Sequence, residues 1–182
     1  MQPVTGRNHS KFPSPVSKKT VRAVAEWPFL RALQCGASPH RHMDAMKNKP
    51  YLTLDDVKRI AAAAEAEALA NQWAVCIAIV DDGGHLLWLQ RLDGTAPISS
   101  QIAPNKARTS VLGRRESRIY EEMINQGRVS FLSAPGLEAL LEGGVPIMVD
   151  GHCVGAVGVS GVKSTEDAQI ARAGIAALGL AG

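Results

Sequence analysis

Aromatic residues and cysteines are scarce in this 182-residue chain. Phe, Trp and Tyr make up 4% of it, so aliphatic side chains, alanine and glycine must fill most of the core. The cysteines number three, and none has the CxxC or Cys/His spacing of a zinc site. A chain of this length buries enough surface to fold without disulfides or a structural metal. These absences favour one ordinary globular domain.

Long apolar runs are also missing. No segment is long enough to cross a bilayer, and the best signal-peptide candidate, residues 21–37, is interrupted by charged residues and a proline. We therefore expect no membrane partner and a cytoplasmic location.

The net charge of +3 is unevenly distributed. The residues before Met43 contain seven Lys or Arg and a single acid, Glu26, which leaves 13 basic and 16 acidic residues in the remainder. A mildly acidic domain argues against a nucleic-acid partner. The proline-rich start has no hydrophobic period and predicts a disordered or weakly structured basic tail over 1–48, followed by one domain over 49–182.

Two hairpins are the clearest structural signals. Asp81-Asp82-Gly83-Gly84 separates the apolar runs 74–80 and 86–92, and Asp150-Gly151 separates 146–149 from 152–160. Asp-Gly and Gly-Gly pairs supply the positive φ angles of tight turns, so each pair of runs should form antiparallel strands.

Helical patterns surround these hairpins. Residues 54–71 repeat apolar side chains at helical spacing after a Thr53 N-cap, and further helices are expected over roughly 98–112 and 115–126, with Pro104 interrupting the first. Ser164 can cap a closing helix. The predicted fold class is α+β, a mostly antiparallel sheet of two hairpins flanked by helices.

Catalytic signatures are missing from the sequence. The glycines at 143–161 fit neither a dinucleotide-binding loop nor a P-loop, and no hydrolase elbow or zinc-protease helix is present. The residues alone indicate an α+β domain with a possible anion site.

Several motifs together resemble the GlcG/HbpS-like family, small haem-binding or haem-degrading-like proteins related to the C-terminal domain of PduO-type corrinoid adenosyltransferases. They are "AIVDDGGHLLWLQRLDGT", "NKARTS", "GGVPIMVDGHCVGAVGVSG" and "EDAQIARAGIAAL", within a region from about Leu52 to Leu178. The resemblance implies an antiparallel α+β fold, homo-oligomers and, for some members, haem binding or degradation.

His85 is the histidine inside the most strongly patterned motif. A neutral imidazole beside a turn can ligate haem iron or transfer a proton. The alternative is a strand-start residue whose ring bonds a nearby backbone group. His152 occupies the equivalent place after the second hairpin turn, with the same two interpretations.

Arg91, Lys106 and Arg108 suit an anion such as a haem propionate or an organic acid. Thr109, with Ser99 and Asn105, could line the same cleft. The alternative assigns these charges to solvent or to an Arg91–Asp93 surface pair.

Three hypotheses follow. The first is a small oligomeric haem-binding protein, haem-sequestering or haem-degrading, with His85 as the axial ligand and apolar contacts around Leu87, Trp88 and Leu89. The second is an enzyme or accessory protein in small organic-acid catabolism, with His85 for proton transfer and Arg91 or Lys106 for the carboxylate. The third is a structural protein whose function is its oligomeric surface.

Overall fold

The computed structural model describes residues 47–180. Residues 1–46 and 181–182 lie outside the described residues, and with them nearly all of the tail predicted at 1–48. That division of the chain therefore stays a prediction.

Within residues 47–180, four strands form one antiparallel sheet in the order β2-β1-β4-β3. The first hairpin pairs β1 (Cys76–Asp81) with β2 (Leu86–Arg91), and the second pairs β3 (Gly144–Val149) with β4 (His152–Ser160). Strands β1 and β4 are the central pair, so β2 and β3 are the edges. The two predicted hairpins and the α+β fold class are confirmed.

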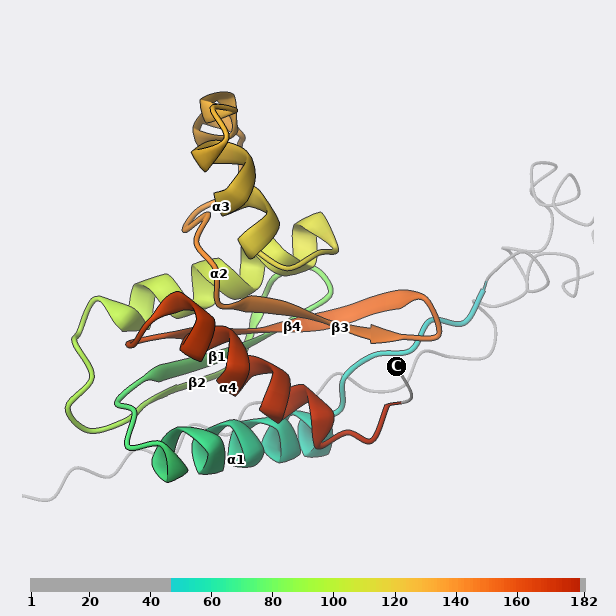
Figure 1. The fold of residues 1–182 in the computed structure, drawn as a ribbon. Helices are drawn as coiled ribbons and strands as arrows, with labels where there is room; N and C mark the ends of the chain where they lie inside the picture. The colour runs from blue at the N-terminus through green and yellow to red at the C-terminus, as the bar shows by residue number, and fades with distance from the viewer. Residues whose placement is uncertain (1–46, 181–182) are drawn as a thin grey trace, which may run out of the picture. The chain divides into compact units, whose positions relative to one another are not determined.

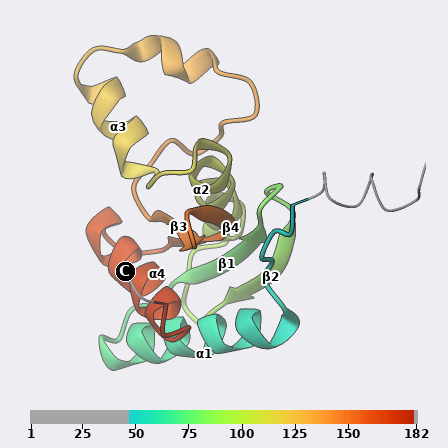
Figure 2. The same cartoon turned by 90° about the vertical axis from the view of Figure 1, so that its right-hand side faces the viewer.

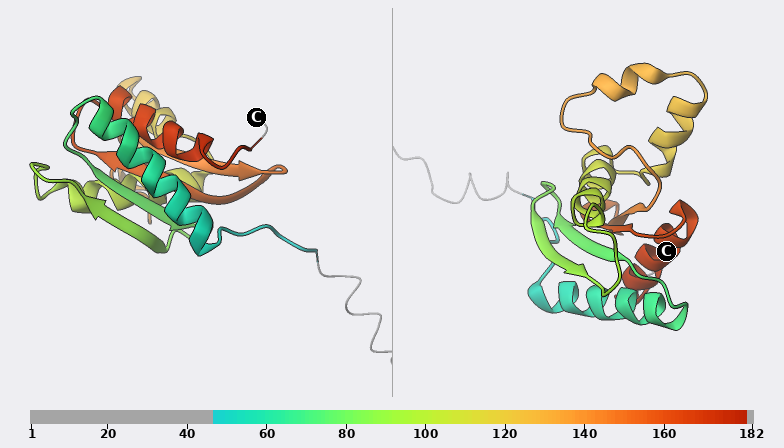
Figure 3. Two further views of the ribbon diagram at one scale, coloured as in Figure 1. Left: turned by 90° about the horizontal axis from the view of Figure 1, so that it is seen from below. Right: turned by 90° about the vertical axis from the view of Figure 1, so that its left-hand side faces the viewer.

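Helices cover both faces of the sheet (Figure 1). Helix α2 (Ser99–Gly113) lies over one face, and α1 (Leu54–Ala70) and α4 (Ser164–Ala176) lie together over the other, as the view from below also shows (Figure 3). Helix α3 (Arg118–Asn125) and the short 3-10 helix η4 (Val129–Ser133) extend away from the sheet (Figure 2).

The two faces differ in the size of their side chains. Alternate residues of β1 point to opposite sides, so Ile77 and Ile79 join the large aliphatic core with α1 and α4. Ala78 and Val80 face α2, where Ala103 and Ala107 pack. Because β4 offers Gly158 here, α2 comes so close that an added Cβ would lie 2.1 Å from the carbonyl oxygen of Ala103. Small residues thus bring α2 directly onto the sheet.

Two local expectations were wrong. Helix α2 continues through Pro104 rather than breaking there. An interior proline costs about 3 kcal/mol, and the close packing of the helix on β4 outweighs that cost. Ser164 is the first residue of α4 rather than its cap; the N-cap is Lys163, whose backbone N–H donates to Glu166 Oε2 at 3.2 Å.

Within residues 47–180, no helix is both long and apolar enough to span a membrane.

Candidate functional site

The turn between β1 and β2 is organised by one carboxylate. The backbone N–H groups of Gly83 and His85 donate to Asp81 Oδ1 at 2.9 and 2.8 Å. Gly84 completes the turn with a φ of 82°, a left-handed conformation that glycine adopts without strain. The aspartate side chain therefore shapes the loop that presents His85.

The imidazole of His85 is held by the same carboxylate and exposed to solvent. Its Nδ1 lies 3.1 Å from both carboxylate oxygens of Asp81, and 77% of the side chain is accessible. A carboxylate at Nδ1 favours the tautomer that carries its proton there, which leaves the Nε2 lone pair free to bind a metal. Within the described residues, Nε2 has no hydrogen-bond partner. This is the arrangement of a histidine ligand with an orienting acid.

Hydrogen bonding also decides the charge of that acid. Partial burial disfavours an ionised Asp81, but the N–H groups of His85 and Gly83 and the imidazole outweigh it and lower the pKa of Asp81. Asp81 is therefore an anion at neutral pH, as its contact with the ring requires.

The turn rests on the last turns of α2. A Cβ added to Gly84 would lie 3.2 Å from Arg108 Cγ and within 4 Å of Val111 and Leu112, so these side chains border the turn directly. Leu86 pairs with Val80, whose side chain faces α2, and is therefore on the same side. The "turn site" is defined by Asp81, His85, Leu86, Arg108 and Leu112.

Apolar surface in the turn site is exposed. Leu86 is 51% and Leu112 43% accessible, and Leu87 and Leu89 continue the exposed surface along β2. Trp88 points to the opposite face and packs against the large core. Of the three apolar residues expected around a haem, Leu87 and Leu89 are exposed and Trp88 is not.

Lys106 lies in the interior rather than in this site. Its ammonium donates to Asp167 Oδ2 at 2.8 Å and to the carbonyl oxygen of Val159 at 3.1 Å, and its side chain is only 4% exposed. Burial raises the pKa of Asp167, and the lysine charge opposes that rise. The pair links α2 to α4, two helices that lie on opposite faces of the sheet.

Thr109 and Arg91 are also separated from His85. The Thr109 hydroxyl is fully buried and donates to the carbonyl oxygen of Glu138 at 2.5 Å. Arg91 ends β2, about 17 Å from Leu86 at the usual rise per strand residue. Lys106, Thr109 and Arg91 are thus not brought to His85. Of the basic residues predicted to hold an anion, Arg108 has its side chain against Gly84, the residue before His85.

His152 differs from His85 in its partner. Its Nδ1 lies 3.0 Å from the carbonyl oxygen of Asp150 in the second hairpin turn, with no carboxylate contact among the described residues. This is the backbone-bonded arrangement that the sequence left open for both histidines.

A small pocket beside the turn site was missed at the sequence level. It measures about 160 Å³ and lies between the two hairpin turns and the end of α2, lined by Lys49, Asp82, Val111, Arg114, Gly151, His152 and Cys153. Its residues come from distant segments without a shared motif. The sequence feature that came closest to indicating this pocket was the equivalent position of the two hairpin turns.

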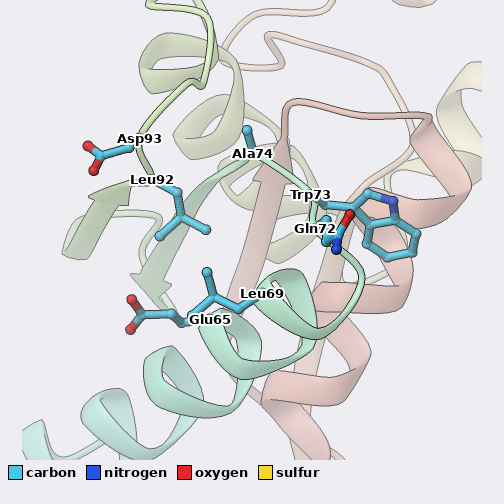
Figure 4. Close-up of a pocket in the computed structure, with 7 residues that line it drawn as sticks. All are labelled: Glu65, Leu69, Gln72, Trp73, Ala74, Leu92 and Asp93. Carbon is cyan, nitrogen blue, oxygen red and sulfur yellow. The ribbon is translucent and has the colours of Figure 1, made fainter.

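A wider cleft, of about 360 Å³, lies at the C-terminal end of α1 (Figure 4). Leu69 and Leu92 approach each other in it, with the carboxylate of Glu65 beside them, and Asp93 also lines the cleft. Acidic walls disfavour an anionic ligand such as haem, so the cleft does not replace the turn site.

Residues 47–180 contain no group of three His, Cys, Asp or Glu side chains placed to hold a metal ion. In that range Cys76 and Cys153 form no disulfide. Cys76 is fully buried, as expected for a small hydrophobic side chain.

Comparison with known proteins identifies the relatives of this fold. The family described as "Haem degrading protein HbpS-like" matches residues 52–176. Protein GlcG of Escherichia coli (strain K12) is 55% identical over 115 residues, which cover 63% of this chain and 85% of GlcG.

Two solved structures share the fold. A double mutant of Streptomyces reticuli HbpS superposes with a TM-score of 0.68 at 32% identity, covering 73% of this chain and 90% of HbpS. A PduOC:Heme complex gives a TM-score of 0.64 at 28% identity, covering 70% of this chain and 95% of PduOC.

Proposed function

This chain belongs to the HbpS-like family, and on that premise we propose that it binds haem, with the imidazole of His85 as the axial ligand. The observation that carries the proposal is the pairing of His85 Nδ1 with Asp81 at 3.1 Å, on a ring that is 77% exposed. An outer carboxylate orients a ligating histidine and makes its free nitrogen more basic. Related proteins support haem as the ligand, since a PduOC structure is a complex with heme.

The surroundings of His85 fit a haem in two respects. Exposed Leu86 and Leu112 offer apolar contact to a porphyrin. Arg108, whose Cγ borders Gly84, supplies a guanidinium that can hold a propionate with two parallel hydrogen bonds. Arg91, about 17 Å from Leu86 along β2, is the more distant of the two arginines predicted to bind an anion. Bound haem would supply a redox-active iron, while the chain holds and orients it.

We also propose a homo-oligomer. Strand β2 is an edge of the sheet, and it carries Leu87 and Leu89 at 41% and 43% exposure. An exposed edge with apolar side chains favours pairing with another chain. The cytoplasmic location expected from the sequence stays a prediction. Light scattering coupled to size exclusion, with and without hemin, measures the assembly; a monomer under both conditions would contradict it.

A hemin titration followed by absorbance tests the haem site. We expect a saturable Soret band in the wild type and an apparent hemin affinity about a hundredfold lower in His85→Ala. Removing the ligand itself should reduce the affinity at least as much as removing the carboxylate that orients a ligand. The matched control is His152→Ala, which removes a histidine from the equivalent place in the other hairpin. Absence of a Soret band in the wild type would overturn haem binding. Equal affinities of His85→Ala and the wild type would overturn the ligand assignment.

A further inference from the structure

The pocket beside the turn site is rich in cationic groups. Lys49 and Arg114 line it together with the imidazole of His152. The one carboxylate among the described residues that line it, Asp82, is already paired with the ammonium of Lys49. Arg114 forms no ion pair within residues 47–180, so its guanidinium remains available. The charge of this small space is therefore positive.

The thiol of Cys153 lines the same pocket as these positive groups. This side chain is partly buried, with Sγ 3.5 Å from the carbonyl oxygen of Gly155. Burial raises the pKa of the Cys153 thiol, and the charges of Arg114 and Lys49 act against that rise. Cys153, Arg114 and Lys49 thus line one pocket although they come from different segments.

The second hairpin turn orients the imidazole of His152. Asp150 and Gly151 both have positive φ angles, 47° and 76°, as in the tight two-residue turns of β-hairpins. The carbonyl oxygen of Asp150 lies 3.0 Å from Nδ1 of His152. A neutral ring that donates from Nδ1 has a lone pair on Nε2, so His152 shapes the pocket wall while Arg114 and Lys49 supply the donors for an anion.

We propose that this pocket binds a small carboxylate anion. Arginine presents two parallel N–H groups that match the two oxygens of a carboxylate, and a lysine ammonium adds a point charge. The volume, about 160 Å³, suits a short organic acid and is too small for haem. The site goes beyond haem binding, because neither His85 nor Arg108 lines it.

Alkylation of Cys153 measures occupancy of this pocket. The full-length protein without haem is treated with iodoacetamide at mildly alkaline pH, with increasing succinate or acetate, and labelling is quantified peptide by peptide. We expect succinate to slow labelling of the Cys153 peptide at least about fivefold in a saturable way. Sodium chloride at equal ionic strength should not, because it lacks the carboxylate that pairs with the guanidinium.

Matched variants separate a built site from general surface charge. Arg114→Gln should weaken protection about tenfold, because it removes a charge-assisted pair of hydrogen bonds. Arg115→Gln removes the same charge one residue away, from a guanidinium that lies over the Tyr120 ring, and should retain protection. Lys49→Gln, outside any helix or strand, is the second pocket variant if Arg114→Gln fails to fold.

Three results would overturn the proposal. They are no saturable protection of Cys153 from iodoacetamide by succinate, equal protection by chloride, or an equal loss of protection in Arg114→Gln and Arg115→Gln. His85→Ala should keep the succinate effect, so failure of the haem proposal and failure of this one give different results.

Discussion

Two acid–base pairs of similar geometry lie in very different surroundings. His85 Nδ1 is 3.1 Å from Asp81, and the side chains are 77% and 35% exposed. Lys106 Nζ is 2.8 Å from Asp167, and the side chains are 4% and 2% exposed. Both basic residues were predicted to bind a ligand, but only His85 can meet one without unfolding part of the molecule.

The difference shows that burial, rather than residue type, separates a structural charge from an available one. A buried charge has lost its hydration and depends on its partner, so removing that partner is costly. An exposed imidazole keeps its hydration, and its carboxylate neighbour serves to orient it. The buried pair should therefore govern folding, and the exposed pair should govern ligand binding.

The largest expected effect is on the buried pair. Lys106→Met leaves the Asp167 carboxylate buried without its ion partner, and we expect a loss of about 3–5 kcal/mol in the free energy of unfolding. Urea denaturation followed by circular dichroism measures it. The double variant Lys106→Met/Asp167→Leu should recover most of the loss, since no buried charge remains. A single-variant loss below about 1 kcal/mol would mean that the pair is not structural.

The turn that presents His85 should be more sensitive than its counterpart in the second hairpin. Gly84→Ala combines a positive φ of 82° with a Cβ contact of 3.2 Å to Arg108, and we expect about 2 kcal/mol of destabilisation.

Gly151→Ala is the control for Gly84→Ala. Its φ of 76° is similar, but an added Cβ there has no atom within 4 Å. Backbone strain alone should therefore cost about 1 kcal/mol. Thermal melts of the two variants separate the effect of backbone strain from the effect of the contact with α2. Equal losses of stability in the two variants would show that α2 does not support the turn.

The smallest effect tests the orienting acid. Asp81→Asn retains the side-chain shape but removes the charge next to His85, and we expect hemin affinity to fall about tenfold, the lower range for outer partners of a metal ligand. The hemin titration measures it. Asp82→Asn, in the same turn, is the matched control. An affinity of Asp81→Asn equal to that of the wild type would mean that the carboxylate only shapes the loop.

The same variant has a stability signature in acid. Because the folded-state pKa of Asp81 lies below the ordinary 3.8, its stabilising contribution is complete above that value and disappears as the pH falls through the folded-state pKa. Asp81→Asn should therefore lose less stability than the wild type when the pH falls below about 4. Urea midpoints at a series of pH values measure the difference, and parallel curves would contradict it.

Local patterns predicted most of the fold. The turn sequences at 81–84 and 150–151 located both hairpins, and the apolar spacing after Thr53 located α1 to within one residue. The predicted interruption at Pro104 was wrong because helix propensity is a local property, whereas α2 is stabilised by packing on β4.

The sequence by itself determined the α+β class, both hairpins and the place of His85 directly after a turn, because turn chemistry and hydrophobic period act over a few neighbouring residues. Only the tertiary structure decided which charges are available. Lys106 and Arg108 are two residues apart on α2, and helix geometry turns one into the core toward Asp167 and the other outward beside Gly84. The pocket of Lys49, Arg114 and Cys153 likewise exists only once distant segments meet. Neighbouring residues in the sequence do not indicate which distant segments pack together, and the burial of a side chain depends on that packing.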